Sequence, residues 1–502
     1  MRAATNGAGR LMWAAFAAFF VAYTIMAVRL SALTPVWMDE VLTLWTIRLP
    51  SSARIYDALL NGAQFSPPVY HWILFYFSKI AGGGYLAMRL PSIAATVLTG
   101  LCSFALFRRY LPLAMAMFGS CLMLEILRLY ALLIRPYALV TACFAVSILL
   151  WDDYKRRSAK WRCALIAFML ALAVSFHIYS LLLIGCVGLM ELIHTVRSRS
   201  LRLPVWIALG AAAATTLLWL PLIHAQSQYV AGDVFSPAYY GRPSIQKLIG
   251  TYMDLGFTGA STLLPVLAVM AAIALAKVFP KLASAPAPSS KATGNFDADF
   301  WTIVFVTASL PVIVYLFAAV VTKSYHGRYA PAAAIGISAI VAGSFSSARL
   351  LRNSAALILL LMAGLTLTHR PHGMQEVDFS SAFHVVPGDA PIVIADGLQF
   401  FALEESAPAD FRSRLVFLKV PPGMPIGDPT NQHLAERWKA LNPALPIEDV
   451  APFVAAHPKF WVLDSLTSDN SVIGDLVSRR LIELTTQANG VLVYRSSSHP
   501  AE

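Results

Sequence analysis

Charged side chains are scarce in this sequence. Asp, Glu, Lys and Arg together make up 13% of its 502 residues, whereas 58% of the residues are hydrophobic. Soluble domains are only about 45–50% apolar, so this composition argues against an ordinary soluble protein. We therefore predict a mostly α-helical, polytopic membrane protein, because helices satisfy their own backbone hydrogen bonds in lipid.

Acidic residues are especially few in the first 369 residues. Of the 27 Asp and Glu residues, 16 follow residue 369. This shift predicts a transmembrane domain over 1–368 and a soluble α/β domain over 369–502. The net charge of +11 does not indicate nucleic acid, because the basic residues form short clusters between apolar runs, as membrane-flanking charge does.

Cysteine motifs and a cleavage site are also missing. The five cysteines form no CxxC pair and no metal-ligand spacing, so we expect small, buried hydrophobic side chains at Cys102, Cys121, Cys143, Cys163 and Cys186. No A-x-A site follows the first apolar run, which predicts an uncleaved first span and not a signal peptide.

Long apolar runs are plentiful. Those long enough to cross a membrane begin near residues 11, 85, 112, 136, 161, 180, 203, 261, 300, 330 and 354. A shorter run at 67–82 contains His71 and Lys79. The positive-inside rule places the basic clusters in the cytoplasm, and they share one side only if the run at 67–82 does not cross. We therefore expect this run to be an interfacial or re-entrant helix that Pro67 and Pro68 begin.

The resulting topology has about eleven spans in a bacterial inner membrane, with a cytoplasmic N-terminus and a periplasmic C-terminus. The first outer loop then covers 31–84. The segment "SAPAPSSKATG" at 284–294 is typical of a flexible cytoplasmic linker. In the tail, "PIVIAD", "RLVFL", "KFWVLD" and "VLVYR" predict strands, and "NQHLAERWKALN" and "SVIGDLVSRRLIEL" predict helices.

Two adjacent acids, Asp39 and Glu40, follow the first apolar run and face the periplasm in this topology. A carboxylate there can accept a proton from a hydroxyl or hold a divalent metal, and cations can stabilise a phosphate. The predicted outer side also has arginines and histidines that could bind such a phosphate: His71, Arg89, Arg135, His177, His326 and Arg328. The combination suits a substrate whose phosphate is attached to a lipid.

Each of these features also has a structural interpretation. Asp39 and Glu40 can cap the helix that follows them, and Arg89 and Arg135 can extend to the membrane interface. His71 and His177 can be packing histidines. Trp37, Trp45, Trp72 and Tyr76 are most simply an interfacial aromatic belt.

Four stretches carry a family resemblance that covers residues 11 to about 350. They are "WMDEVLTLW", "SPPVYHWILFYFSKIAGGGYLAMRLPSIAATVLTG", "RPYAL" and "GRYAPAA". The sequence resembles the GT-C class of membrane glycosyltransferases, and within it the bacterial family related to protein O-mannosyltransferases and aminoarabinose lipid A transferases. That family also has a helix at the position of 67–82.

The resemblance implies inverting transfer of a sugar from a polyprenyl-phosphate donor to an acceptor hydroxyl on a lipid, glycan or protein, at the periplasmic face. It implies Asp39 as the base, with Glu40 positioning the acceptor or a metal. It implies that Arg328 holds the donor phosphate. We further expect Tyr329, Arg135 and Arg89 to contribute to donor-phosphate binding, and Tyr70, His71, Tyr137 and His177 to bind substrate.

One position departs from the family pattern. Where the family often has an acid before the "RPYAL" stretch, this sequence has Leu133. A divalent metal, Mg or Mn, therefore stays open, with Asp39 or Glu40 as its candidate ligands. Two alternatives also stay open: a transporter or flippase of lipid-linked sugars, and a relative that binds lipid without catalysis. We find no internal repeat of the kind that transporters usually carry.

Overall fold

The computed structural model describes residues 2–236, 239–256, 298–344, 349–370, 379, 384–394, 396–421, 424, 429–465, 471–488 and 490–497. The predicted span near 261 and the predicted linker at 284–294 lie outside these residues. The chain divides into two compact units. The helical unit comprises Met1–Leu33, Ser66–Leu220 and Pro243–Pro371; the mixed unit comprises Thr34–Phe65, Pro221–Arg242 and His372–Glu502.

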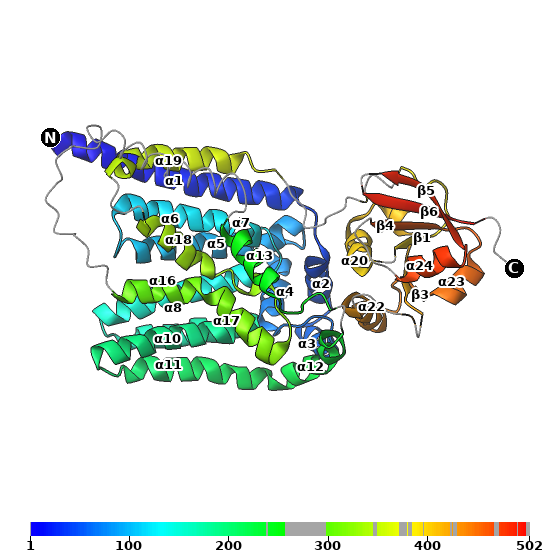
Figure 1. Ribbon diagram of the computed structural model, residues 1–502, viewed down its shortest axis with the longest axis horizontal. Helices are drawn as coiled ribbons and strands as arrows, with labels where there is room; N and C mark the ends of the chain where they lie inside the picture. Colours follow the sequence, from blue (N-terminus) through cyan, green and yellow to red (C-terminus); the bar gives the residue numbers. More distant parts are fainter. Residues whose placement is uncertain are drawn as a thin grey trace. The chain divides into compact units, whose positions relative to one another are not determined.

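The helical unit is a bundle in which α1 and α19 lie side by side along one edge (Figure 1). Next to them α5, α6 and α18 pack together, and α8, α9, α10, α11 and α16 continue the bundle. The helices are α1 (Arg2–Leu33), α4 (Val69–Ala81), α5 (Tyr85–Phe107), α6 (Leu113–Ile126), α7 (Arg128–Ala131), α8 (Tyr137–Arg156), α9 (Lys160–Phe176), α10 (Leu181–Ser198), α11 (Leu203–Ala214), α13 (Ile245–Gly256), α16 (Ala298–Ala308), α17 (Leu310–Phe317), α18 (Ala333–Ser344) and α19 (Arg349–Leu367).

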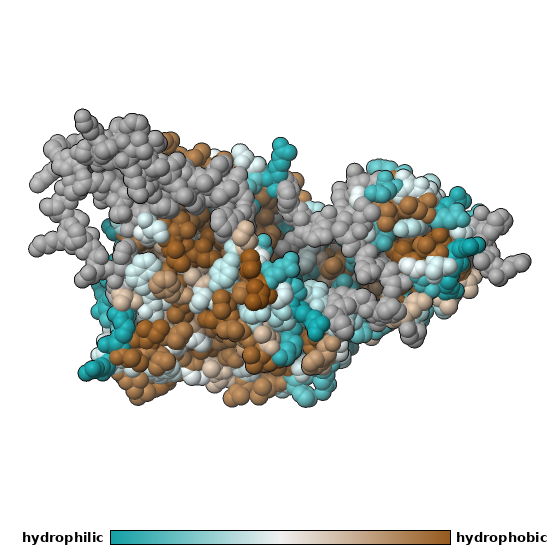
Figure 2. Space-filling view, in the orientation of Figure 1, coloured by the Kyte–Doolittle hydropathy of each residue, from teal (hydrophilic) through white to brown (hydrophobic). Residues whose placement is uncertain are grey.

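Several of these helices are long and apolar enough to cross a membrane. Among the described residues they are Gly9–Leu33, Tyr85–Phe107, Tyr137–Arg156, Ile178–Ser198 and Leu203–Val234, together with Ala298–Ala308 and Leu310–Thr322, a pair bent by 46°. Shorter apolar helices are α6, α18 and residues Ser354–Leu367 of α19. Each predicted span except the one near 261 therefore coincides with a helix or with the bent pair. The face drawn in Figure 2 is largely hydrophobic over this unit.

The run at 67–82 forms α4, as predicted. Its 13 residues span about 20 Å, which is less than the roughly 30 Å hydrocarbon core of a bilayer. Tyr70, His71 and Leu74 are buried against the bundle, whereas Ile80 is 86% exposed. This amphipathic pattern supports an interfacial helix, and its outer location stays a prediction.

Several buried charges among the described residues of the helical unit are paired. Asp152 accepts from Arg109 at 2.6 Å, and Glu191 accepts from the Trp151 indole at 2.8 Å as well as from Arg202. A charge in or near lipid is costly unless a partner compensates it. These pairs join the ends of α5, α8, α10 and α11. The basic clusters predicted to be cytoplasmic lie at the same ends, at 108–109, 155–157 and 197–202. The five cysteines are free and buried, as predicted.

The mixed unit contains a six-stranded sheet with the order β3-β2-β1-β4-β6-β5. β1 (Ile392–Ile394), β2 (Leu415–Lys419), β3 (Ile447–Asp449) and β4 (Trp461–Ser465) are parallel, and β6 (Val491–Ser496) and β5 (Ile482–Ala488) are antiparallel. The helices are α2 (Met38–Ile47), α3 (Ser52–Leu60), α12 (Leu220–Val234, of which Leu220 belongs to the helical unit), α20 (Gly397–Ser406), α21 (Ala409–Arg412), α22 (Pro429–Leu441), α23 (Val450–Ala456) and α24 (Ser471–Ser478).

The predicted α/β tail is confirmed, with one correction. The four predicted strands correspond to β1, β2, β4 and β6, but the predicted helix over 471–484 ends at Ser478 as α24. Arg480 adopts the left-handed φ of 55°, and this turn reverses the chain into β5. The residues "IELTT" then supply β-branched side chains that favour a strand. The domain boundary at 368/369 stays a prediction.

The topology can be tested by cysteine labelling, because the native cysteines are buried and give little background. We expect a membrane-impermeant maleimide applied to the periplasmic side to label Ala53→Cys, Ala231→Cys and Ala409→Cys, but not Ser158→Cys or Ser200→Cys. All five positions are exposed. Labelling of Ser158→Cys from outside would contradict the eleven-span topology and the periplasmic location of Asp39.

Candidate active-site residues

The acid pair lies in the first turn of α2, in the mixed unit. Trp37 precedes the helix in an extended conformation, and its backbone N–H donates to Glu40 Oε2 at 3.3 Å. The helix N-terminus carries a partial positive charge that stabilises carboxylates there. Asp39 is 8% exposed and Glu40 is 1% exposed. Glu40 therefore has the capping role that the sequence left open, whatever else it does.

The backbone of Asp39 is fixed by segments distant in sequence. Its carbonyl oxygen accepts from Thr43 Oγ1 at 3.0 Å and from Gln64 Nε2 at 3.3 Å. Gln64 also donates to Thr43 Oγ1 at 3.1 Å, and its own carbonyl accepts from Gln226 Nε2 at 3.0 Å. A network of this kind holds the first turn of α2 in one orientation.

The helical unit brings together four rings, which we call the aromatic cluster: Tyr137, His177, Tyr179 and Tyr329. The centroid of Tyr329 lies 4.4 Å from that of Tyr179, 4.8 Å from that of His177 and 6.4 Å from that of Tyr137. These rings come from the start of α8, the α9–α10 junction and the turn before α18. Three of the predicted site residues therefore meet.

Arg135 and Arg328 flank this cluster. Arg135 Nη2 donates to the Tyr137 hydroxyl at 3.4 Å, and its Cζ lies 5.6 Å from the centroid of the Tyr137 ring. The Cζ of Arg328 lies 6.0 Å from the centroid of the Tyr329 ring. Both guanidinium groups act electrostatically on His177. The structure thus places two cations and two tyrosines from two of the four motifs, together with His177, within one neighbourhood.

The segment that carries Arg328 is held on two sides. Tyr179 bonds to Thr322 Oγ1 at 2.5 Å and to the carbonyl of Ser324 at 2.8 Å. On the other side, the Tyr325 hydroxyl donates to Thr251 Oγ1 on α13 at 2.9 Å. A Cβ added to Gly327 would lie 2.6 Å from Thr251 Oγ1, so glycine allows this close approach of backbone and helix. Neither Tyr179 nor Thr251 belongs to a motif that marked it as a candidate site residue in the sequence.

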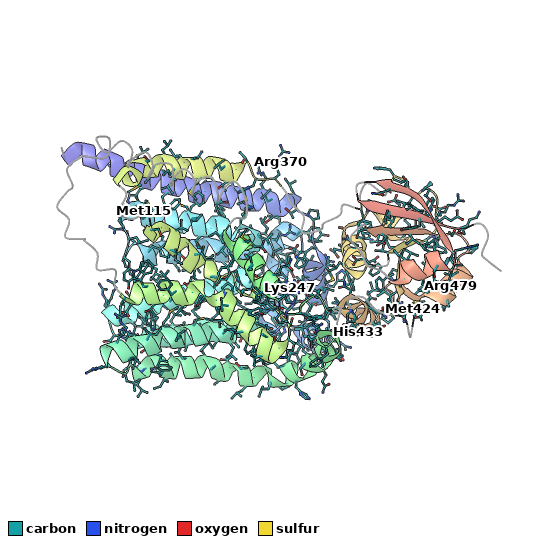
Figure 3. All side chains as sticks on the ribbon, in the orientation of Figure 1. Met115, Lys247, Arg370, Met424, His433 and Arg479 are labelled. Atoms are coloured by element: carbon teal, nitrogen blue, oxygen red, sulfur yellow. The ribbon has the colours of Figure 1, made fainter. Side chains whose placement is uncertain are left out.

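Three histidines of the helical unit have lowered pKa values. Burial lowers the pKa of His71 to about 3, with Arg135 contributing and a hydrogen bond to the Pro67 carbonyl opposing. Burial, Arg135 and Arg328 lower the pKa of His177 to about 3. The pKa of His326 is also lowered, by burial and by Arg328, Lys247 and His177. These imidazoles are neutral near pH 7, so the arginines and Lys247 carry the positive charge of this region. Figure 3 labels Lys247 on α13.

Arg89 lies deeper than the other predicted phosphate ligands. It is fully buried on α5, and its Nη1 donates to the carbonyl of Ser31 at 2.8 Å, which joins α5 to α1. Ser92 on the same helix donates to the carbonyl of Leu133 at 2.7 Å. These bonds favour a structural role for Arg89, and its phosphate contact stays a prediction. Tyr70 and His71 are buried on α4 with their ring centroids 5.7 Å apart.

The donor set for a divalent metal is sparse. Among the described residues, no three His, Cys, Asp or Glu side chains form a group that could hold a metal ion. Glu40 is bonded to the Trp37 N–H, and Leu133 replaces the acid of the family pattern. The described residues therefore do not form a site that fits the Mg or Mn that the sequence left open.

Comparisons with known proteins bear on the fold. No protein-family model and no curated protein matches the sequence. Among solved structures, the apo state of ArnT from Cupriavidus metallidurans aligns with a TM-score of 0.56 over 98% of both chains, at 13% identity. The same protein bound to undecaprenyl phosphate aligns with a TM-score of 0.50 over 99% of both chains, at 12% identity. This chain has the GT-C fold.

This finding confirms the fold that the family resemblance implied. An oligosaccharyltransferase of Archaeoglobus fulgidus also aligns, with a TM-score of 0.43 and 10% identity over 89% of this chain and 68% of that one. At 10–13% identity the likeness concerns the fold. The roles of individual residues have to be argued from their chemistry.

The lowered histidine pKa values predict acid sensitivity. An unfolded histidine has a pKa of about 6.5, whereas the folded values of His71 and His177 are about 3. Between these values the unfolded chain binds more protons, so the stability present above pH ~6.5 is lost as the pH falls toward 3. We expect the Tm in detergent to fall from pH 7 to pH 5, and His177→Gln to flatten this slope. His224→Gln, at an exposed position, is the matched control. An unchanged slope in His177→Gln would disprove this assignment.

Proposed function

We propose that this chain transfers a glycosyl group from a polyprenyl-phosphate-linked sugar to an acceptor hydroxyl at the periplasmic face of the membrane, with inversion at the anomeric carbon. The observation that carries the proposal is the pair of arginines at the aromatic cluster, beside apolar helices of membrane-spanning length. Two guanidinium groups with neutral histidines suit a singly charged phosphodiester on a lipid.

Arg328 and Arg135 act on the donor phosphate. When the bond from the anomeric carbon to the phosphate oxygen breaks, the polyprenyl phosphate departs with the electron pair and gains a negative charge. Guanidinium groups already in position stabilise that charge more in the transition state than in the ground state, and this difference accelerates the reaction. Tyr329 and Tyr137 orient the two arginines through the ring contacts described above.

Asp39 acts as the general base. It takes the proton of the acceptor hydroxyl as that oxygen forms its bond to the anomeric carbon on the face opposite the departing phosphate, which inverts the configuration. Glu40 positions the acceptor, and its bond to the Trp37 N–H fixes its carboxylate. Tyr70, His71 and His177 bind substrate as neutral groups. The acceptor class (lipid, glycan or protein) and the sugar are left to experiment.

A deletion strain tests this function in the cell. We expect a polyprenyl-phosphate sugar to accumulate in the outer leaflet of the inner membrane, where periodate added to spheroplasts oxidises it. Mass spectrometry of the lipid extract before and after periodate gives the species and the leaflet. Wild-type protein should clear the lipid and Asp39→Asn should not. Accumulation protected from periodate would indicate a flippase, and no accumulation would contradict the proposal.

A further inference from the structure

One carboxylate of the mixed unit, that of Glu405, receives three hydrogen bonds from the end of α2 and the residue that follows it. Arg48 binds it through both terminal nitrogens, each at 2.7 Å, and the Trp45 indole N–H donates to Oε2 at 2.9 Å. Glu405 lies near the end of α20, 357 residues after Arg48, and its side chain is 7% exposed. A two-pronged guanidinium–carboxylate pair fixes orientation as well as distance.

Aromatic packing strengthens this attachment. The Trp45 ring meets Phe401 of α20 edge to face at 5.4 Å and Trp438 of α22 at 5.2 Å. Both partners are buried, and the Trp438 indole donates to the carbonyl of Ala63 at 3.3 Å. The interpretation of Trp45 as part of an interfacial belt is therefore wrong: its ring and its N–H are used inside the mixed unit.

Trp45 and Asp39 share one short helix, and Arg48 directly follows its last residue. α2 has ten residues, and Trp45 follows Asp39 by six positions, or about 9 Å along the axis. A helix this short moves as one body, so a tilt at Trp45 and Arg48 displaces the carboxylate of Asp39. Displacement of a reacting group by about 1 Å can lower a rate on the order of 10²-fold.

We propose that Glu405 is a positioning residue for the transfer reaction: through Arg48 and Trp45 it orients α2 and thereby the carboxylate of Asp39. The C-terminal part of the chain is then a component of the catalytic apparatus. This inference rests on the proposed role of Asp39 as the base. Glu405 itself touches neither substrate nor Asp39.

The test uses the full-length protein in detergent. Glu405→Gln keeps the shape but removes the charge that Arg48 needs. We expect kcat to fall on the order of 10-fold or more with the donor KM unchanged, and amide hydrogen exchange over residues 40–48 to become faster. The exchange over β1 and β2 should stay as in the wild type, which shows that the fold is retained. The charge reversal Arg48→Glu with Glu405→Arg should recover kcat in part, because Trp45 then lacks its acceptor.

Asp475→Asn is the matched control. Asp475 pairs with exposed Arg479 at 3.2 Å on α24 of the same unit (Arg479 is labelled in Figure 3), and its loss should change neither kcat nor exchange over 40–48. If Glu405→Gln does not accumulate, Arg48→Ala provides the same readouts, since the Arg48 side chain is half exposed.

Two results would overturn the proposal: faster exchange in α2 with normal kcat, or a lower kcat with unchanged exchange and no recovery by charge reversal. Failure of the proposed function is recognised separately. If Asp39→Asn stays active, Asp39 is not the base, and the exchange data still report whether Glu405 holds α2.

Discussion

Asp39→Asn is expected to lower glycosyl transfer by about 10²–10⁴-fold, because an acceptor alcohol is a poor nucleophile at neutral pH and a positioned base supplies that factor. The substitution keeps the shape of the side chain and removes its ability to take the proton. The backbone bonds from Thr43 and Gln64 to residue 39 involve the carbonyl oxygen and should persist. We therefore expect normal insertion, a Tm close to that of the wild type and an unchanged donor Kd.

Asp57→Asn serves as the control for Asp39→Asn. Asp57 is an exposed acid on α3 of the same unit, and its loss should leave turnover unchanged. Glu40→Gln should reduce transfer less than Asp39→Asn, because glutamine can still accept from the Trp37 N–H and preserve the cap. Turnover near the wild-type value in Asp39→Asn would exclude this carboxylate as the base.

Arg328→Ala is expected to nearly abolish use of the donor, and Arg328→Lys to weaken it. A lysine keeps the charge but loses the two-pronged geometry with which a guanidinium binds phosphate. The measurement is a donor titration in detergent that yields KM and kcat for each variant. We expect the lysine variant to raise the donor KM and to lower kcat, because charge grows on the phosphate as the bond breaks.

Lys323→Asn is the matched control for Arg328. Lys323 is an exposed cation of the same turn, and asparagine tolerates its left-handed φ of 56°. It should leave donor use unchanged. Unchanged KM and kcat in Arg328→Lys would show that Arg328 only anchors the chain at the interface, and Arg135 would then be the next candidate for the phosphate.

The sequence predicted the parts of the fold that depend on local composition. Apolar runs located the long helices within the described residues, and the length of the run at 67–82 together with the distribution of basic residues predicted α4 as a separate helix. Its outer location stays a prediction. Arg135 and Tyr137 share one motif, whereas His177 and Tyr329 lie in two other segments of the sequence. The structure brings these candidate site residues together in the helical unit.

Other features had no local signal. The joining of residues 34–65 and 221–242 with the C-terminal sheet in one compact unit depends on pairs such as Arg48 with Glu405, which are far apart in the sequence. The interpretation of Trp45 failed for the same reason. The prediction of a helix through residue 484 was wrong because the apolar periodicity continues past the end of α24. The left-handed backbone of Arg480, which turns the chain, has no sequence signal.

The proposed function requires the chain to cleave the bond between a sugar and polyprenyl phosphate. This cleavage can be measured by reconstituting the purified protein into vesicles with the lipid-linked sugar extracted from the deletion strain and a periplasmic acceptor fraction. The measured quantity is free polyprenyl phosphate. We predict its release in equal amount to the sugar transferred by the wild type, and no release by Asp39→Asn. Movement of the intact lipid-linked sugar between leaflets without release of polyprenyl phosphate would contradict the account.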